Sequence, residues 1–167
     1  TSTKPCMKPR YFPSRIVSGG QTGVDQAALT VAIHLGLDHG GWCPKGRLAE
    51  DGAIPVRYPL IECDDSRYKV RTEKNVFDSD ATLILNLGRL SAGTALTARL
   101  ASKFHRPLLV LDLSGKPRGD TVLSWVELNF VKTLNIAGPR ESQRRGIEKL
   151  AYAFLLHVWV EPRLGAN

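Results

Sequence analysis

The sequence lacks a long uninterrupted apolar stretch, and its cysteines are few and scattered. No apolar run approaches the roughly 18 residues that a membrane-spanning helix needs, and residues 1–15 have no apolar centre of the kind found in signal peptides. The cysteines, Cys6, Cys43 and Cys63, match neither a zinc-binding spacing nor a disulfide framework. We therefore expect a protein of a reducing, cytoplasmic compartment with no membrane segment.

Arrangements typical of nucleophilic catalysis are also missing. No Cys–His or Ser–His–Asp set and no convincing pair of carboxylates is apparent. Three histidines, His34, His105 and His157, fall inside expected helices, where structural roles are common, and the role of His39 is left open. The chain has no internal repeat and no low-complexity segment.

Positive charge is abundant but unevenly distributed. The 167 residues carry a net charge of +7, of which Lys4, Lys8, Arg10 and Arg15 supply +4 without an acidic neighbour, leaving +3 (7 − 4 = 3) for the rest. Three prolines interrupt the same basic stretch. We expect a basic, flexible tail over 1–14, one domain over 15–160 and a short tail over 161–167. A net charge of this size favours anionic partners in general, and its concentration in the tail weakens the case for nucleic acid as the partner.

Apolar periodicity predicts a strand followed by a helix five times over. Continuous apolar runs such as 81–87 and 108–113 are typical of strands buried on both faces. Amphipathic stretches such as 23–35 and 147–158 predict the helices that follow strands. This alternation predicts an α/β, Rossmann-like, three-layer domain, with a mainly parallel five-stranded sheet and helices on both faces.

One glycine-rich turn near the start of the chain is the principal candidate site. It joins a short buried strand to a helix and contains Gly19, Gly20, Gln21, Thr22, Gly23 and Asp25. Paired glycines allow close backbone approach, and the helix N-terminus offers free N–H groups to an anion. The motif is neither the G-x-G-x-x-G of dinucleotide-binding proteins nor the phosphate loop G-x-x-x-x-G-K-S/T. The alternative interpretation is a plain strand-to-helix connection.

Other polar, glycine-rich loops also follow expected strands, and the carboxyl ends of parallel strands meet at one edge. On an expected helix over 67–77, Arg67, Arg71 and Asn75 recur every four residues and so share a face. Each candidate also has an ordinary interpretation as a surface charge, a helix cap or a core aromatic residue. The further candidates for binding an anionic ligand are Gly41, Trp42, Lys45, Arg47, Gly88, Gly93, Thr94 and Arg140.

Five of these stretches together resemble the molybdenum carrier proteins. They are S-G-G-Q-T-G-V-D (18–25), H-G-G-W-C-P-K-G-R-x-A-E-D-G (39–52), N-V-x-D-S-D-A-T (75–82), G-T-A-L-T (93–97) and L-N-I-A-G-P-R-E-S (134–142). That family is related to Rossmann-like nucleotide-sensing domains, including the cytokinin-activating phosphoribohydrolases. The resemblance implies a homo-oligomer, dimer or tetramer, that binds molybdenum cofactor (molybdopterin) or a molybdate-type oxyanion. It also implies contact with enzymes that make or use this cofactor.

The resemblance has one informative departure. The phosphoribohydrolases carry P-G-G-x-G-T-x-x-E with a catalytic glutamate, whereas Thr97 stands at that position here. A hydroxyl does not supply the carboxylate that stabilises positive charge at a ribosyl carbon. The departure favours a binding or carrier protein. The alternative is a hydrolase of nucleotides or other phosphorylated compounds, with Asp25 or Glu50 as its acid.

Overall fold

A five-stranded parallel sheet forms the centre of the molecule. In the computed structural model, which describes residues 10–164, the strand order is β2-β1-β9-β7-β8, and every neighbouring pair is parallel. The chain runs from β1 to β2 at one edge, whereas β7 leads to β8 at the other edge and β9 returns to the middle. The order therefore reverses between β1 and β9, which is where open parallel sheets bind ligands. The predicted α/β fold is confirmed.

The elements have the following bounds. The strands of the large sheet are β1 (Arg15–Val17), β2 (Asp38–Gly40), β7 (Ala81–Asn86), β8 (Leu108–Asp112) and β9 (Thr133–Ala137). The helices are α1 (Val24–Leu35), α2 (Tyr68–Asp78), α3 (Ala92–Lys103), α4 (Gly119–Leu128) and α5 (Ile147–Leu164), with a 3-10 turn η1 (Leu113–Gly115). Each predicted helix and strand is present, with boundaries that differ by only a few residues.

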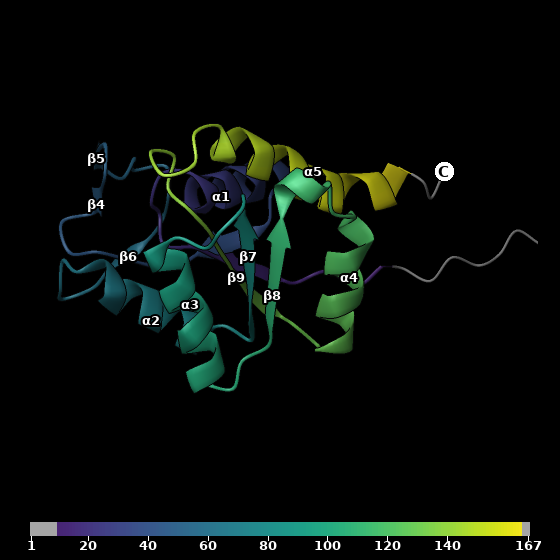
Figure 1. Ribbon diagram of the computed structural model, residues 1–167, viewed down its shortest axis with the longest axis horizontal. Coiled ribbons are helices and arrows are strands. Elements are labelled where there is room, and N and C mark those ends of the chain that lie inside the picture. Colours follow the sequence, from purple (N-terminus) through teal and green to yellow (C-terminus); the bar gives the residue numbers. More distant parts are fainter. Residues whose placement is uncertain (1–9, 165–167) are drawn as a thin grey trace, which may run out of the picture.

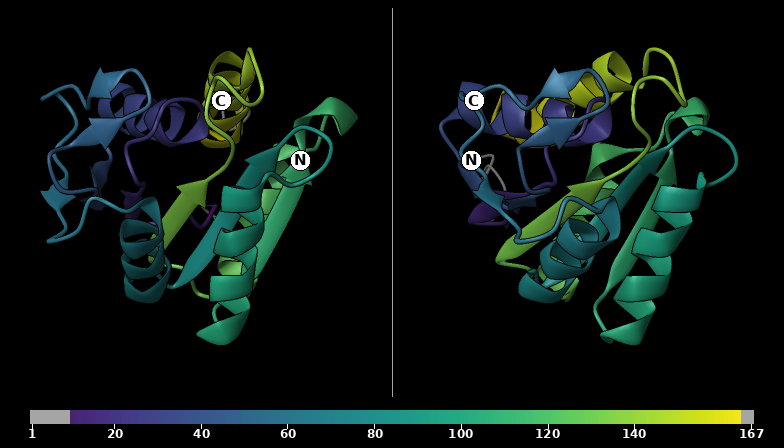
Figure 2. Two further views of the ribbon diagram at one scale, coloured as in Figure 1. Left: turned by 60° about the vertical axis from the view of Figure 1, so that its left-hand side comes forward. Right: turned by 90° about the vertical axis from the view of Figure 1, so that its left-hand side faces the viewer.

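Helices cover both faces of the sheet. Figures 1 and 2 show α1 beside α5 and α2 beside α3, with the sheet between the two pairs. Strand β7 explains this arrangement, because Leu83 and Leu85 join the main core formed with α1, α4 and α5. A smaller cluster, which includes Val76 of α2 and Leu100 of α3, lies on the opposite face. Successive side chains of this fully buried strand thus point alternately toward the helices on the two faces of the sheet.

The long segment between β2 and α2 contains two small sheets that periodicity did not reveal. Strands β3 (Trp42–Cys43) and β6 (Ile61–Glu62) pair in parallel, and β4 (Leu48–Ala49) pairs antiparallel with β5 (Gly52–Ala53). Each strand has two residues, which is too short for an alternating pattern. The segment buries Ile54 and Tyr58 against Leu29 of α1, so it has a small core of its own.

The amphipathic last helix offers no exposed tryptophan for subunit contact, because Trp159 is buried in the main core, where its ring packs against Phe12. One expectation requires correction. Helix α2 was expected to begin at Arg67, but Arg67 is its N-cap in an extended conformation. Arg67 therefore does not share a helix face with Arg71 and Asn75.

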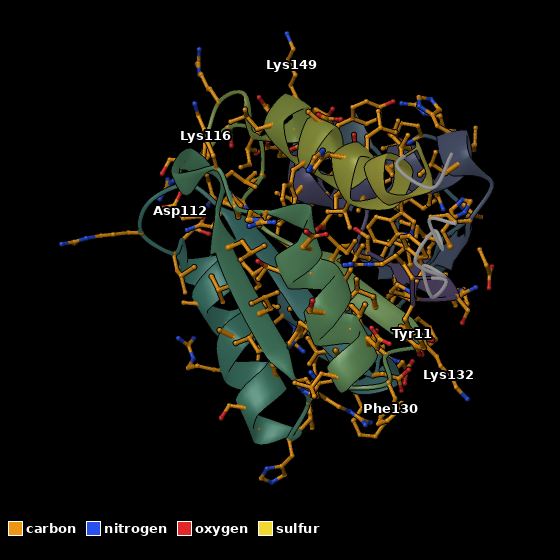
Figure 3. The ribbon with its side chains drawn as sticks, turned by 90° about the vertical axis from the view of Figure 1, so that its right-hand side faces the viewer. Tyr11, Asp112, Lys116, Phe130, Lys132 and Lys149 are labelled. Carbon is orange, nitrogen blue, oxygen red and sulfur yellow. The ribbon has the colours of Figure 1, made fainter. Side chains whose placement is uncertain are left out.

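The beginning of the described chain packs against the end of the sheet. The Tyr11 hydroxyl donates to the carbonyl of Val131 over 3.0 Å, and Tyr11 lies near Phe130 and Lys132 in Figure 3. Residues 1–9, which make up most of the predicted basic tail, and 165–167 lie outside the described residues. No helix within 10–164 is both long and apolar enough to cross a membrane.

Candidate functional site

A polar cavity of about 90 Å³ opens at the carboxyl edge of the sheet, where the strand order reverses. The end of β9 and the turn after β1 form its floor, and α2 and the start of α3 form its walls. Figure 2 shows the segments after β7 and β9 at this end of the sheet. The lining residues are Gln21, Asp25, Tyr68, Lys69, Arg71, Thr72, Ser91, Gly93, Thr94, Leu96, Thr97, Ala137, Gly138, Arg140 and Gln143.

An ion pair of low exposure lies at the inner end of this cavity. Arg71 Nη1 lies 3.2 Å from Asp25 Oδ2, and the side chains are 13% and 5% exposed. Burial raises the pKa of Asp25, and the neighbouring guanidinium of Arg71 opposes that rise. Arg71 Nε is buried and has no hydrogen-bond partner among the described residues. A buried N–H donor without a partner is costly, and this one belongs to a residue that lines the cavity.

A second arginine reaches the cavity from the loop after β9. The guanidinium carbons of Arg140 and Arg71 lie 5.5 and 5.7 Å from the centre of the Tyr68 ring, so one aromatic ring contacts both cations. Arg140 Nη1 also lies 3.9 Å from Glu50 Oε2. Two guanidinium groups therefore border the same small space, which is suited to an oxyanion with several acceptor oxygens.

Glu50 connects two loops and does not line the cavity. Its carboxylate accepts hydrogen bonds from the Thr22 hydroxyl and from both the backbone N–H and the hydroxyl of Ser142. Burial alone raises the pKa of Glu50, but these hydrogen bonds and Arg140 outweigh it, so the pKa lies below its ordinary value. An ionised, fully engaged carboxylate is poorly suited to act as a general acid at neutral pH.

Small hydroxyl side chains form the α3 wall. Ser91 is the N-cap, and its Oγ accepts a hydrogen bond from the Thr94 N–H over 3.4 Å. Thr97 is 4% exposed and donates to the carbonyl of Gly93 over 3.1 Å. A Cβ on Gly93 would meet no atom within 4 Å, so the cavity is open at this point. This wall offers hydroxyl groups but no carboxylate.

The glycine turn packs against protein groups on several sides. The Gln21 N–H donates to Asp25 Oδ2 over 3.2 Å, and the Thr22 N–H donates to the Gln21 side chain over 3.1 Å. Gly20 has φ +79°, and a Cβ there would overlap Leu60. Gly23 has φ +83° and packs against the carbonyl of Pro139. These two glycines are thus explained by backbone conformation and close packing, and only Gln21 and Asp25 of this turn line the cavity.

The structure brings seven of the predicted site residues to the cavity. They are Gln21, Asp25, Arg71, Gly93, Thr94, Thr97 and Arg140. The remaining candidates do not line it, and several have evident structural contacts. Arg47 donates to the carbonyls of Ile54, Pro55, Tyr58 and Leu60, which holds the 54–60 segment together. Arg67 is 76% exposed and pairs with Asp65 at 2.7 Å.

Other candidates on the β2 side serve packing between segments. Asn75 is buried and bonds both the N–H and the carbonyl of Trp42, over 2.8 and 2.9 Å. The Trp42 indole donates to Asp78 and lies under Lys74. Gly41 lies against Ser18, where a Cβ would overlap a backbone oxygen. The Lys45 N–H donates to the carbonyl of Asp65. On the other side of the sheet, after β7, the Gly88 N–H donates to the Asp112 carboxylate.

Sequence reasoning did not identify several lining residues. Tyr68 lies three residues before Arg71, a spacing that places the two side chains on one helix face and could have identified Tyr68, and Thr72 lies four residues after Tyr68. Ser91 immediately precedes a predicted helix and is a preferred N-cap residue. Gln143 and Lys69 carried no comparable signal.

Comparisons with known proteins identify the family of the chain and one similar solved structure. The model of the circularly permutated YpsA SLOG family (cpYpsA) matches residues 16–159. The chain belongs to this family. A crystal structure from Syntrophus aciditrophicus SB, described as a "putative molybdenum carrier protein", is 42% identical, with a TM-score of 0.86. The alignment covers 89% of this chain and 96% of that one. The comparison with curated proteins gave no match.

The cavity of this cpYpsA chain is lined largely by cationic and hydroxyl-bearing side chains. Within residues 10–164, no group of three or more His, Cys, Asp or Glu side chains is placed to hold a metal ion. The buried thiols Cys43 and Cys63 are unpaired, and burial raises the pKa of each.

Proposed function

We propose that this cpYpsA protein binds a small oxyanion in the cavity and carries it. The ligand is a molybdate-type oxyanion or the phosphate end of a larger compound such as molybdenum cofactor. The observation that carries this proposal is the pair of arginines, Arg71 and Arg140, that line the same small cavity and contact the same ring of Tyr68. An anion in the cavity would accept hydrogen bonds from these two guanidinium groups.

The size of the cavity favours a compact ligand. The cavity volume is about 90 Å³. Pockets that enclose drug-sized ligands usually have volumes of about 300–1,000 Å³. A tetrahedral oxyanion or a single phosphate group suits this space, and the remainder of a pterin would lie outside it. The relative described as a molybdenum carrier supports the molybdenum-type cargo within this ligand class.

The experiment is isothermal titration of the protein with molybdate, tungstate, phosphate and sulfate, with chloride holding ionic strength constant. We expect saturable binding of one or more oxyanions. Arg71→Lys keeps the charge but removes Nε and the planar guanidinium, so it should weaken binding about tenfold or more. Arg67→Lys is the matched control, because Arg67 is exposed and outside the cavity. No oxyanion binding by the parent, or equal binding by both variants, would overturn the proposal.

A hydrolase is the second candidate, and one observation favours it. Asp25 is a buried carboxyl that lines the cavity, and burial raises its pKa, as is common for catalytic acids. The substrate class would be nucleotides or other phosphorylated compounds, with Asp25 as the acid. Incubation with nucleoside monophosphates and sugar phosphates, followed by assay of free base and phosphate, separates this candidate from carriage.

We also propose that the protein forms a homo-oligomer and transfers its cargo to enzymes that make or use molybdenum cofactor. Apart from the resemblance, the support is an exposed apolar patch at the end of α4, where Leu128 and Phe130 are each 78% exposed. Trp125, on the same helix, is half-buried. Light scattering of the purified protein tests the assembly.

A further inference from the structure

We propose that oxyanion binding in this cavity is coupled to the uptake of a proton by Asp25. The proposal rests on the proposed function, since it concerns the same ligand and the same cavity. It assigns Asp25 a role in selecting ligands. An anion that arrives without a proton needs one delivered to Asp25, and an anion that brings its own proton does not.

The carboxyl group of Asp25 lies at the wall of the cavity in which we propose that the anion binds. Asp25 is 3% exposed and lines the cavity together with Arg71 and Arg140. Its Oδ2 already accepts from the Gln21 N–H at 3.2 Å and faces Arg71 Nη1 at 3.2 Å. A bound oxyanion would therefore compete with Asp25 for Arg71 and would repel its carboxylate.

Few charged groups surround Asp25, so no other group of the cavity is evident that could relieve this repulsion by taking up a proton. From α2, Arg71 faces it directly, with Lys69 and Tyr68 on the same wall of the cavity. From the loop after β9, Arg140 lines the cavity, but its other side faces Glu50. From α3, the lining side chains are hydroxyl-bearing or apolar, and from its own turn Gln21 is neutral. Asp25 is the one carboxyl among the residues that line this cavity.

Elementary electrostatics then fixes the direction of the coupling. Two negative groups that share a site cannot both remain ionised cheaply, so the more basic one takes a proton. Burial already raises the pKa of Asp25 in the empty protein, and a neighbouring anion raises it further. The proton comes from solvent and bonds to a carboxyl oxygen of Asp25, with no other bond made or broken. The neutral carboxyl then releases Arg71 to the anion and becomes a hydrogen-bond donor itself.

This arrangement distinguishes oxyanions that still carry a proton at the pH of binding from those that do not. Sulfate stays a full dianion near neutral pH, so its binding requires a protonated Asp25. A phosphate monoester loses its second proton with a pKa of about 6, so near neutral pH a fraction of its molecules still carry that proton when they bind. Ligand release is favoured when pH rises, because Asp25 then returns to the carboxylate and regains Arg71.

The decisive measurement uses the parent protein and tungstate or sulfate as the probe. Isothermal titration at about pH 7.5 in two buffers of different ionisation enthalpy gives the number of protons taken up with each anion. We expect an uptake approaching one proton, and an affinity that rises up to about tenfold for each pH unit of acidification. Saturable binding with no proton uptake would overturn this inference but leave the proposed function intact. Absence of binding at every pH would overturn both.

Asp25→Asn provides an independent test. The amide keeps the size of the side chain and does not titrate, so proton uptake should disappear and affinity should become independent of pH. At about pH 8 the variant should bind the anion at least as tightly as the parent, because the competing charge is gone. Asp38→Asn is the matched control, since Asp38 is an exposed partner of Arg15 outside the cavity. A folded Asp25→Asn protein that keeps the parent's proton uptake would overturn the inference.

Discussion

The guanidinium of Arg71 occupies the space above Gly19. Its Nη1 reaches Asp25 Oδ2 at 3.2 Å, and a Cβ built on Gly19 would overlap the same Nη1. The absence of a side chain at Gly19 is thus what lets an arginine of α2 reach the turn after β1. A glycine expected to admit a ligand instead admits the side chain that we propose binds it.

The first prediction follows from this contact. Gly19→Ala should fold, because Gly19 does not have a positive φ and the overlapping atoms belong to the end of a flexible side chain. The methyl group should displace the Arg71 guanidinium from its position beside the cavity, and a bound anion would then lose its hydrogen bonds from Arg71. Since a hydrogen bond to a charged group contributes about 1.5–3 kcal/mol, oxyanion affinity should fall about 10- to 100-fold. Titration calorimetry with tungstate measures this loss.

The matched control is Gly115→Ala. Gly115 also lacks a positive φ, and a Cβ there meets no atom within 4 Å, so the change adds a methyl group far from the cavity. It should leave affinity unchanged. If Gly19→Ala binds tungstate as tightly as Gly115→Ala, the position of Arg71 does not determine anion binding.

Gly20→Val would be a poor test of whether a ligand approaches this turn. Gly20 has φ +79°, and a Cβ would overlap Leu60 and lie 2.9 Å from Ile54. The variant would lose stability through strain and packing whether or not a ligand binds nearby. Gly19→Ala is therefore a more informative substitution than Gly20→Val.

The second prediction concerns Asn75, which joins α2 to β3. Its side chain bonds the N–H and the carbonyl of Trp42, and it is 2% exposed. Asn75→Ala should lower the free energy of unfolding by about 1–3 kcal/mol, because two backbone groups lose their partner. Urea unfolding followed by tryptophan fluorescence measures this. Asn129→Ala, at the half-buried end of α4, removes one bond to a backbone carbonyl and should cost less; an equal or smaller loss for Asn75→Ala would contradict the assignment.

The third prediction concerns pH and Glu50. The pKa of Glu50 is depressed in the folded protein, so its stabilising effect is fully present above its ordinary value of 4.5. That effect is lost as pH falls through the depressed, folded-state pKa. The parent should therefore be more stable than Glu50→Gln near neutral pH, and the difference should shrink in acid. Urea unfolding of both proteins across this range tests the sign, and a difference that grows on acidification would contradict it.

Much of the fold could be predicted, because periodicity reports burial directly. The continuous apolar run of β7 reflects a strand buried on both faces, and the apolar stripe of α5 reflects a helix buried on one face. The small sheets after β2 could not be found this way, since their strands have two residues each and their core depends on α1. Their positions are decided by tertiary contacts with Leu29 and by the Arg47 hydrogen bonds.

The convergence of loops could be predicted, but the side chains that meet there could be predicted only in part. Parallel topology brings the loops together at the carboxyl edge, and Asp25, Thr94 and Arg140 line one cavity there; ligand binding by these residues stays a prediction. Which charges face inward depends on helix phase and local pairing. Arg71 is one turn inside α2 and points to Asp25, whereas Arg67 precedes the helix and pairs with Asp65. Because α2 begins one residue later than predicted, Arg67 lies outside the helix and Arg71 lies within it.

The last prediction is that the protein releases no free base from nucleoside monophosphates. Thr97 lies in the cavity wall, 4% exposed, and its hydroxyl donates to the carbonyl of Gly93. It has no charge with which to stabilise a cationic ribosyl carbon, and the neighbouring Thr94 offers only another hydroxyl. Chromatography of reaction mixtures should therefore show no base above the uncatalysed background. Release of base by the parent that disappears in Asp25→Asn would instead assign hydrolysis to the buried carboxyl, because Asp25 is the one acidic side chain among the residues that line this cavity.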